Sequence, residues 1–239
     1  MNVWKSFGAS VIGPGHVSAG IPNQDAWAAF HHEWGDGIVV SDGLGSKPLS
    51  DFGSRAACLA VARAIHSCSR MPEIDRAVLA DRIMSRWVSL IAPLSPRDCA
   101  ATCLFGFRMK DGGVLIGTLG DGLAAVLKPD DSVVSLSDDK SEGFSNITDA
   151  LSPGVGFKEW RWLSMREEEC RSILLCSDGV CDDLSDQDGF VREFFATHRQ
   201  LSSLSASRRA REMLAKWPTP GHSDDKTIAC LLREEVEHE

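Results

Sequence analysis

The chain has 239 residues, 43% of them hydrophobic and 25% charged, which is the composition of an ordinary globular protein. This length favours a single domain spanning residues 1–239. The formal charge is −9 and the basic residues are scattered, so we expect no nucleic acid partner, because phosphate backbones are held by clustered Lys and Arg. No run approaches 18 apolar residues, so we expect no membrane partner.

The cysteine pattern indicates the cellular compartment. Eight cysteines lie at positions 58, 68, 99, 103, 170, 176, 181 and 230. No pair has the Cys-x-x-Cys spacing and no Cys/His cluster suits zinc, whereas most have the apolar neighbours typical of buried free thiols. The N-terminus lacks a basic segment followed by an apolar run, so no signal peptide is expected. These features predict a reduced, cytoplasmic protein.

Short runs with strand propensity, bounded by Gly, Pro, Asp or Ser, occur along most of the chain. They predict strands at Val3–Ile12, Ala26–His32, Gly37–Ser41, Cys99–Arg108, Gly113–Leu119, Leu123–Leu127, Ser132–Leu136, Arg171–Cys176 and Thr227–Leu232. The Asp111-Gly112 pair between two of these runs predicts a hairpin.

Three segments have helical character. Between Ser50 and Ser67, apolar residues including Phe52 and Leu59 recur with a period near 3.6, and Ser50 is a candidate N-cap. Further helices are predicted at Ile74–Ile91 and Ser203–Lys216, each followed by a proline. Because strands and helices are grouped rather than alternating, the order favours an α+β fold with antiparallel sheets.

An irregular segment at about 137–159 is rich in Ser, Gly, Asp and Pro. A loop this long within a compact domain is often functional, and we expect it to form a flap.

Acidic residues stand at the ends of several predicted strands. Asp42 and Asp178 each follow an apolar run within a Ser-Asp-Gly triplet, Asp25 begins a strand, and Asp224 precedes the last one. A single Asp-Gly most often only closes a β-turn. Several carboxylates on rigid strand ends, however, are what a site for Mg²⁺ or Mn²⁺ requires, because these cations prefer about six oxygen ligands. Spacing alone leaves both interpretations open.

The same residues resemble the PP2C-type, metal-dependent protein phosphatases, in a bacterial variety of that family. The matching motifs follow in the family's order: Asn23-Gln24-Asp25, Val40-Ser41-Asp42-Gly43-Leu44-Gly45-Ser46, Gly120-Asp121-Gly122, Leu175-Cys176-Ser177-Asp178-Gly179-Val180 and Asp224-Asp225-Lys226-Thr227. The resemblance implies a four-layer αββα sandwich, in which two antiparallel sheets are flanked by helices.

The resemblance also implies a set of metal ligands for two or three Mg²⁺ or Mn²⁺ ions. Asp42 would bridge two metals, with Gly43 offering its backbone carbonyl, and Asp178 and Asp224 would complete the shell of the first metal. Asp25 would act on the second metal, and Asp98 matches the ligand of a third. Asp42 and Asp25 are therefore the predicted catalytic residues.

The substrate-binding residues depart from the family pattern. The usual phosphate-binding Arg before Asp25 is absent, and His16 is the nearest substitute. Leu44 stands where some members carry a His proposed as general acid. Within the presumed flap, Asn146 is a candidate for the substrate cleft.

Together these features predict a protein serine/threonine phosphatase that hydrolyses phosphoserine and phosphothreonine by attack of a metal-bound water. Its partners would be a phosphoprotein substrate and a cognate Ser/Thr kinase. The alternatives are a catalytically weak regulatory module of the same family, which binds a phosphoprotein or partner, and a metal-dependent phosphodiesterase. The complete set of four aspartates argues against the first, and the absence of a basic groove against the second.

Overall fold

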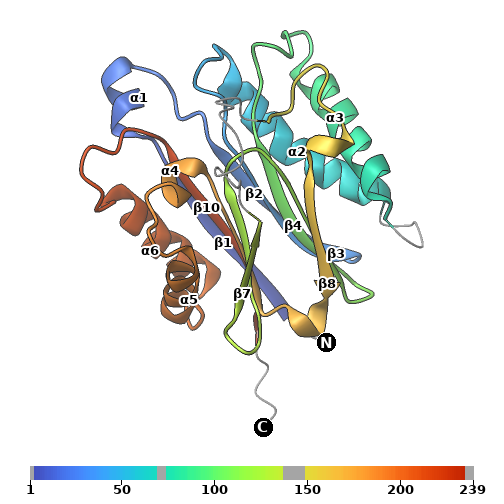
Figure 1. Cartoon of the computed structure of the whole chain (residues 1–239), viewed down its shortest axis with the longest axis vertical. Helices are drawn as coiled ribbons and strands as arrows, with labels where there is room; N and C mark the ends of the chain where they lie inside the picture. The colour runs from blue at the N-terminus through green and yellow to red at the C-terminus, as the bar shows by residue number, and fades with distance from the viewer. Residues whose placement is uncertain (1–2, 69–73, 137–148, 235–239) are drawn as a thin grey trace.

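The computed structural model describes residues 3–68, 74–136 and 149–234 and contains two five-stranded sheets packed face to face. Helices cover the outer face of each sheet, so the chain is a four-layer αββα sandwich, as predicted (Figure 1). The two sheets pack through apolar side chains, among them Ile38, Leu104, Ile173 and Leu231, each fully or almost fully buried.

One sheet contains both ends of the described chain. Its order is β1 (Val3–Val11), β10 (Lys226–Glu234), β9 (Ser172–Cys176), β6 (Leu123–Leu127) and β7 (Val133–Leu136). All neighbours are antiparallel, and β1 pairs with β10 over its whole length, from Val3 opposite Glu234 to Val11 opposite Lys226. The last strand therefore lies inside the sheet rather than at its edge.

The other sheet has the order β2 (Ala26–His32), β3 (Gly35–Ser41), β4 (Cys103–Met109), β5 (Gly113–Leu119) and β8 (Arg161–Arg166), again antiparallel throughout. The predicted hairpin joins β4 and β5: Asp111 Oδ1 accepts a hydrogen bond from Gly113 N, and Gly112 has the positive φ of 84° that favours glycine. The predicted strand Cys99–Arg108 begins four residues late, because Ala101 instead makes isolated bridges to Gly43 and Leu151.

Two helices, α2 (Ser50–Cys68) and α3 (Arg76–Ile91), cover the second sheet. The first turn of α2 also lies close to the segment before β4: a Cβ on Gly53 would stand 1.7 Å from the carbonyl oxygen of Cys99. The predicted apolar face is partly wrong, since Phe52 and Leu59 are 50% and 43% exposed. Ser50 is the first helical residue and its buried hydroxyl has no partner among the described residues, so it does not act as the predicted cap.

The first sheet is covered by α5 (Gln187–His198) and α6 (Ser203–Ala215). The helix α6 was predicted, but α5 was not. Asp186 caps α5 by accepting from Gly189 N, and the buried residues Val191, Phe194, Phe195 and His198 follow a helical period. Two short helices, α1 (Pro14–Ala19) and α4 (Asp178–Cys181), and the 3₁₀ turns Phe157–Glu159 and Glu167–Glu169 complete the described elements.

Within the described ranges, no helix is both long enough and apolar enough to cross a lipid bilayer. Of the predicted flap, residues 137–148 lie outside the described part, and residues 149–159 form an irregular segment that ends in a 3₁₀ turn.

Candidate metal-binding active site

The acidic residues singled out from the sequence come from both sheets. Asp25 directly precedes β2 and Asp42 directly follows β3, whereas Asp178 begins α4 just after β9, and Asp224 stands two residues before β10. Each side chain is thus fixed by a strand end, and the two sheets bring four separate segments together. The convergence of these carboxylates is what a binding site for cations needs.

Asp42 is the centre of this cluster. Its half-buried carboxyl lies within hydrogen-bonding reach of both Asp25 and Asp178. Burial, followed by the negative charges of Asp25 and Asp178, raises the pKa of Asp42 well above its usual value. Three carboxyl groups this close cannot all ionise without a compensating positive charge.

Asp25 is the most buried member, with 6% of its surface exposed. Its Oδ2 accepts a 2.7 Å hydrogen bond from Ser177 Oγ, whereas its buried Oδ1 has no partner among the described residues. Burial raises the pKa of Asp25 to about 7, although the bond from Ser177 acts in the opposite direction. An unpartnered carboxylate oxygen facing other carboxylates is a ready ligand for a cation or for a water bound to one.

Asp178 and Asp224 extend the cluster towards solvent. Burial raises the pKa of Asp178, and the charges of Asp121 and Asp224 act in the same direction. Asp121 is therefore a further acidic neighbour of Asp178. In the sequence, Asp121 belongs to the Gly120-Asp121-Gly122 motif after β5, for which no ligand role was predicted.

The backbone around Asp42 is held by a second set of contacts. Asp42 N donates to Thr102 Oγ1 at 2.9 Å, and Thr102 N donates to the carbonyl of Asp42 at 2.7 Å. Gly43 N donates to the carbonyl of Gln24, and a Cβ at Gly43 would stand 2.7 Å from the backbone of Ser50. The absence of a side chain at Gly43 thus lets three segments meet beside the cluster.

His16 joins the site through Asp225. The 2%-exposed carboxylate of Asp225 accepts hydrogen bonds from Gly13 N at 2.7 Å, from Gln24 N at 2.7 Å and from His16 Nδ1 at 2.9 Å. Gln24 precedes Asp25, so a single buried side chain ties the His16 loop to the acidic cluster. With Nδ1 occupied in this way, Nε2 is the ring nitrogen that remains for a ligand.

Two predicted residues stand apart from these contacts. Asp98 uses its backbone, donating to Ser95 O and accepting from Leu49 N. Burial, followed by the negative charge of Asp98, raises the pKa of Cys99. Asp98 as the ligand of a third ion stays a prediction. Asn146 lies outside the described residues, and its role in the substrate cleft also stays a prediction.

A buried lysine lies on the outer side of the cluster. Lys226 Nζ contacts the carbonyl of Asp224 and His222 Nδ1, both at 3.2 Å, and stands 5.9 Å from the centre of the Trp217 ring. Burial lowers the pKa of Lys226, against the attraction of Asp183 and Asp224. It lines a cavity of about 190 Å³ together with Asp178 and Asp224, so the cavity beside the carboxylates contains a positive charge of its own.

The donor set suits a hard cation. All the candidate side-chain ligands are carboxylates, which Mg²⁺ and Mn²⁺ prefer. No three acidic, His or Cys side chains in the described ranges already surround a common point as a closed cage. Carboxylates that ligate a cation lie close together, however, and without the cation burial and their mutual repulsion raise their pKa values, as they do here. The orphaned Oδ1 of Asp25 also fits a bound cation.

Comparisons with known proteins identify the family and the fold. The family model for protein phosphatase 2C matches residues 12–217, so the chain belongs to the protein phosphatase 2C family. No curated protein matches the sequence closely enough to count as a relative.

Several solved structures share the fold at low sequence identity. The photosystem II phosphatase PBCP superposes with a TM-score of 0.70 at 16% identity, over 98% of this chain and 100% of its own. The catalytic domain of the serine/threonine phosphatase PstP, in complex with two manganese ions, gives a TM-score of 0.63 at 16% identity, with the same coverage. RsbX in complex with magnesium gives 0.62 at 14% identity, again over 98% and 100% of the two chains.

Proposed function

We propose that this chain is a metal-dependent protein serine/threonine phosphatase that hydrolyses phosphoserine and phosphothreonine. The observation that carries the proposal is the convergence of Asp25, Asp42, Asp178 and Asp224, from four segments of the chain, on one site where burial raises the pKa values of the first three. Its support from outside the structure is the family match and the manganese and magnesium ions named for PstP and RsbX.

Asp42, Asp178 and Asp224, with the Gly43 carbonyl, would hold Mg²⁺ or Mn²⁺, and Asp25 would hold a second ion directly or through water. Bound cations of this kind lower the pKa of water and offset charge on phosphoryl oxygens, which is the chemistry that hydrolysis of a phosphomonoester needs. The chain's own contribution is to fix these carboxylates on strand ends, where they need no rearrangement to act.

His16 is proposed to contact the substrate. Asp225 orients its ring through Nδ1, and so presents Nε2 to a phosphoryl oxygen or to the departing Ser or Thr oxygen. This placement compensates for the arginine that the family usually has before the Asp25 motif. A cognate kinase acting on the same phosphoprotein belongs to the same proposal, as does a cytoplasmic location.

The test is hydrolysis of a phosphothreonine peptide with Mn²⁺ and with EDTA. We expect Mn²⁺-dependent phosphate release by the unaltered chain, and a loss of at least 100-fold, roughly 3 kcal/mol, in Asp42→Asn and in Asp178→Asn. Asp81→Asn removes an exposed charge from α3 and is the matched control, expected to keep full activity.

Two other outcomes would point to different functions. Phosphopeptide binding without release by the unaltered chain would favour a regulatory module over an enzyme. Faster hydrolysis of a nucleotide phosphodiester than of the phosphopeptide would favour a phosphodiesterase.

A further inference from the structure

A chain of hydrogen bonds from Ser6 through His31 to Asp36 joins the two sheets at their edge strands. Ser6 lies on β1 and His31 on β2, and each of these strands is the edge of its sheet. Ser6 Oγ and His31 Nε2 are 2.7 Å apart, and His31 Nδ1 and Asp36 Oδ1 are also 2.7 Å apart. A hydroxyl, an imidazole and a carboxylate connected in this order form the arrangement that activates serine as a nucleophile in acyl transfer.

Asp36 determines which nitrogen of the neutral His31 ring carries the proton. A carboxylate only accepts hydrogen bonds, so Nδ1 donates to Asp36, and Nε2 is left to accept from Ser6 Oγ. In the sheet, Asp36 stands directly opposite His31 on one side and directly opposite Arg108 on the other. Arg108 Nη2 lies 3.5 Å from Asp36 Oδ2. Strands rather than loops therefore hold the base in position.

The arrangement is open to solvent and lies far from the acidic cluster. The His31 side chain is 45% exposed, and Ser6 is half-buried. Along β2, His31 stands six residues beyond Asp25, which corresponds to about 20 Å of extended strand. Because the hydrogen bonds of this chain involve none of the carboxylates of the proposed metal site, the proposed phosphatase function does not explain it.

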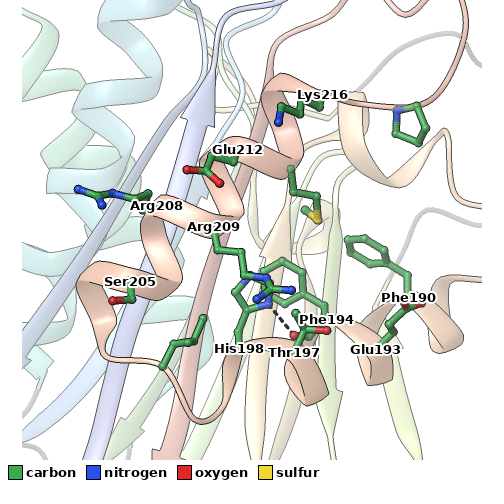
Figure 2. A pocket seen from close by; sticks show the side chains of 13 residues that line it. Phe190, Glu193, Phe194, Thr197, His198, Ser205, Arg208, Arg209, Glu212 and Lys216 are labelled. Atoms are coloured by element: carbon green, nitrogen blue, oxygen red, sulfur yellow. Dashed lines mark hydrogen bonds between the residues drawn. The ribbon is translucent and has the colours of Figure 1, made fainter.

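A cavity of about 430 Å³ lies between β1, β2 and α6, a volume within the range of sites for small organic ligands. Its lining includes Gly8, which is on the same face of β1 as Ser6. It also includes Trp27, which is on the same face of β2 as His31. A Cβ on Gly8 would stand 2.9 Å from the Trp27 ring, so the two strands meet here as they do at Ser6. The third wall is formed by α6, where Arg208 extends away from α5 (Figure 2).

The backbone of β1 supplies a donor for the negative charge that develops in acyl transfer. Gly8 N donates to Ser207 Oγ of α6 at 3.3 Å, and so points away from β10. Because successive N–H groups of a strand point in alternate directions, the N–H group of Ser6 points to the same open edge. In serine proteases the N–H group of the nucleophile itself is one of the two donors to the oxyanion. Ser6 therefore brings both a nucleophile and an oxyanion donor to this edge.

We propose that Ser6 and His31 catalyse the hydrolysis of small carboxylic esters, an activity separate from the phosphatase, with Asp36 as the positioning residue. Ser6 Oγ attacks the carbonyl carbon of the ester and passes its proton to His31 Nε2. The ester C–O bond then breaks, and the departing alcohol takes that proton. Water next attacks the acyl carbon and gives a proton to His31, which returns it to Ser6 Oγ as the carboxylic acid is released. The acyl group lies against Trp27 in the cavity.

The test uses the full chain in EDTA, with p-nitrophenyl acetate as the substrate and an alkyl fluorophosphonate as a label. We expect saturable ester hydrolysis, and the fluorophosphonate should modify Ser6 alone, as located by mass spectrometry, and stop the hydrolysis. Ser6→Ala should abolish the labelling and lower kcat/KM at least tenfold. Ser135→Ala removes an exposed hydroxyl from β7, at the other edge of the same sheet, and should change neither.

Asp36→Asn separates positioning from a merely structural role. The amide no longer fixes the tautomer of His31, so kcat should fall at least tenfold while KM changes less than twofold. His32→Ala, which removes the exposed neighbouring ring, should change kcat less than twofold.

The labelling of the unaltered chain decides the matter even if a variant does not fold. The proposal is overturned if Ser6 is not labelled, if the label lies on His31 or is spread over several residues, or if Ser6→Ala hydrolyses the ester at the original rate. Asp42→Asn should keep the ester hydrolysis, so the result does not depend on the phosphatase proposal.

Discussion

Ser177 Oγ donates a 2.7 Å hydrogen bond to Asp25 Oδ2, across 152 positions of sequence and from one sheet to the other. The same hydroxyl oxygen accepts from Thr227 N at 3.0 Å, at the start of β10. One buried serine thus connects Asp25 with the strand that follows Asp224. Its hydrogen bond leaves Oδ1 of Asp25 as the oxygen that can bind a ligand.

The Ser177→Ala variant should therefore weaken cation binding more than it weakens the fold. Without the hydroxyl, Asp25 loses its orienting donor, and the loss of such a supporting contact typically costs 10–100-fold in metal affinity. We expect the Mn²⁺ dissociation constant, measured by calorimetry, to rise about tenfold or more. Ser89→Ala, which removes an exposed hydroxyl from α3, is the control, and an equal effect in both variants would contradict the role of Ser177.

The stability of the cation-free protein should fall as the pH rises. Burial raises the pKa of Asp25 in the folded state to about 7, against roughly 3.9 in an unfolded chain. The folded state therefore holds a proton that the unfolded state releases, so this contribution is complete below about pH 4 and is lost as the pH approaches 7. In EDTA we expect the thermal midpoint to drop by about 5 °C or more between pH 5 and pH 7.5.

Two comparisons test the cause of this pH dependence. Asp25→Asn has no proton to lose and should flatten the slope. Saturating Mn²⁺ should abolish the fall, because the cation takes the place of the protons. A slope that is the same in Asp25→Asn would assign the effect to other groups.

The Asp225→Asn variant should destabilise the protein strongly. The carboxylate accepts three N–H groups in a buried setting, and an amide would turn its NH₂ group towards one of these donors. We expect a loss of about 3 kcal/mol in the free energy of unfolding, measured in urea. His16→Ala keeps the bonds from Gly13 and Gln24 and should cost no more than about 1 kcal/mol, so equal losses would argue against this account.

Gly53 is predicted to tolerate no side chain. An added Cβ would overlap the carbonyl oxygen of Cys99, so α2 would have to move away from the loop that leads to Thr102. Thr102 in turn accepts a hydrogen bond from Asp42 N. Gly53→Ala should cost at least about 2 kcal/mol in chemical unfolding. Gly45, where the nearest atom to a Cβ is 3.9 Å away, provides the control, and Gly45→Ala should be near neutral.

Runs with strand propensity, together with the Gly, Pro, Asp and Ser residues that bound them, were sufficient to predict most of the fold. Runs with strand propensity such as Gly113–Leu119 and Leu123–Leu127 correspond to observed strands without change. The helix over Ser50–Cys68 was located correctly, but its predicted apolar face is only partly buried: Ala60 and Ile65 are buried, whereas two large residues are not. Phe52 and Leu59 face outwards, and the contact face consists of Gly53, Ala57, Ala60 and other small residues, whose value lies in close backbone approach.

The site was only partly accessible from sequence. Asp25, Asp42, Asp178 and Asp224 could be named because strand-end position and motif agree. Asp225 appeared only within the Asp224-Asp225-Lys226-Thr227 motif, without a role, because its three donors come from residues about 200 positions away and nothing local signals them.

The pairing of β1 with β10 affects folding during synthesis as well as the final structure. The strand at 226–234 lies between β1 and β9, so the sheet stays divided until nearly all the described residues have been synthesised. Because such distant contacts form slowly, we expect the nascent chain to acquire its acidic site only after β10 has been synthesised.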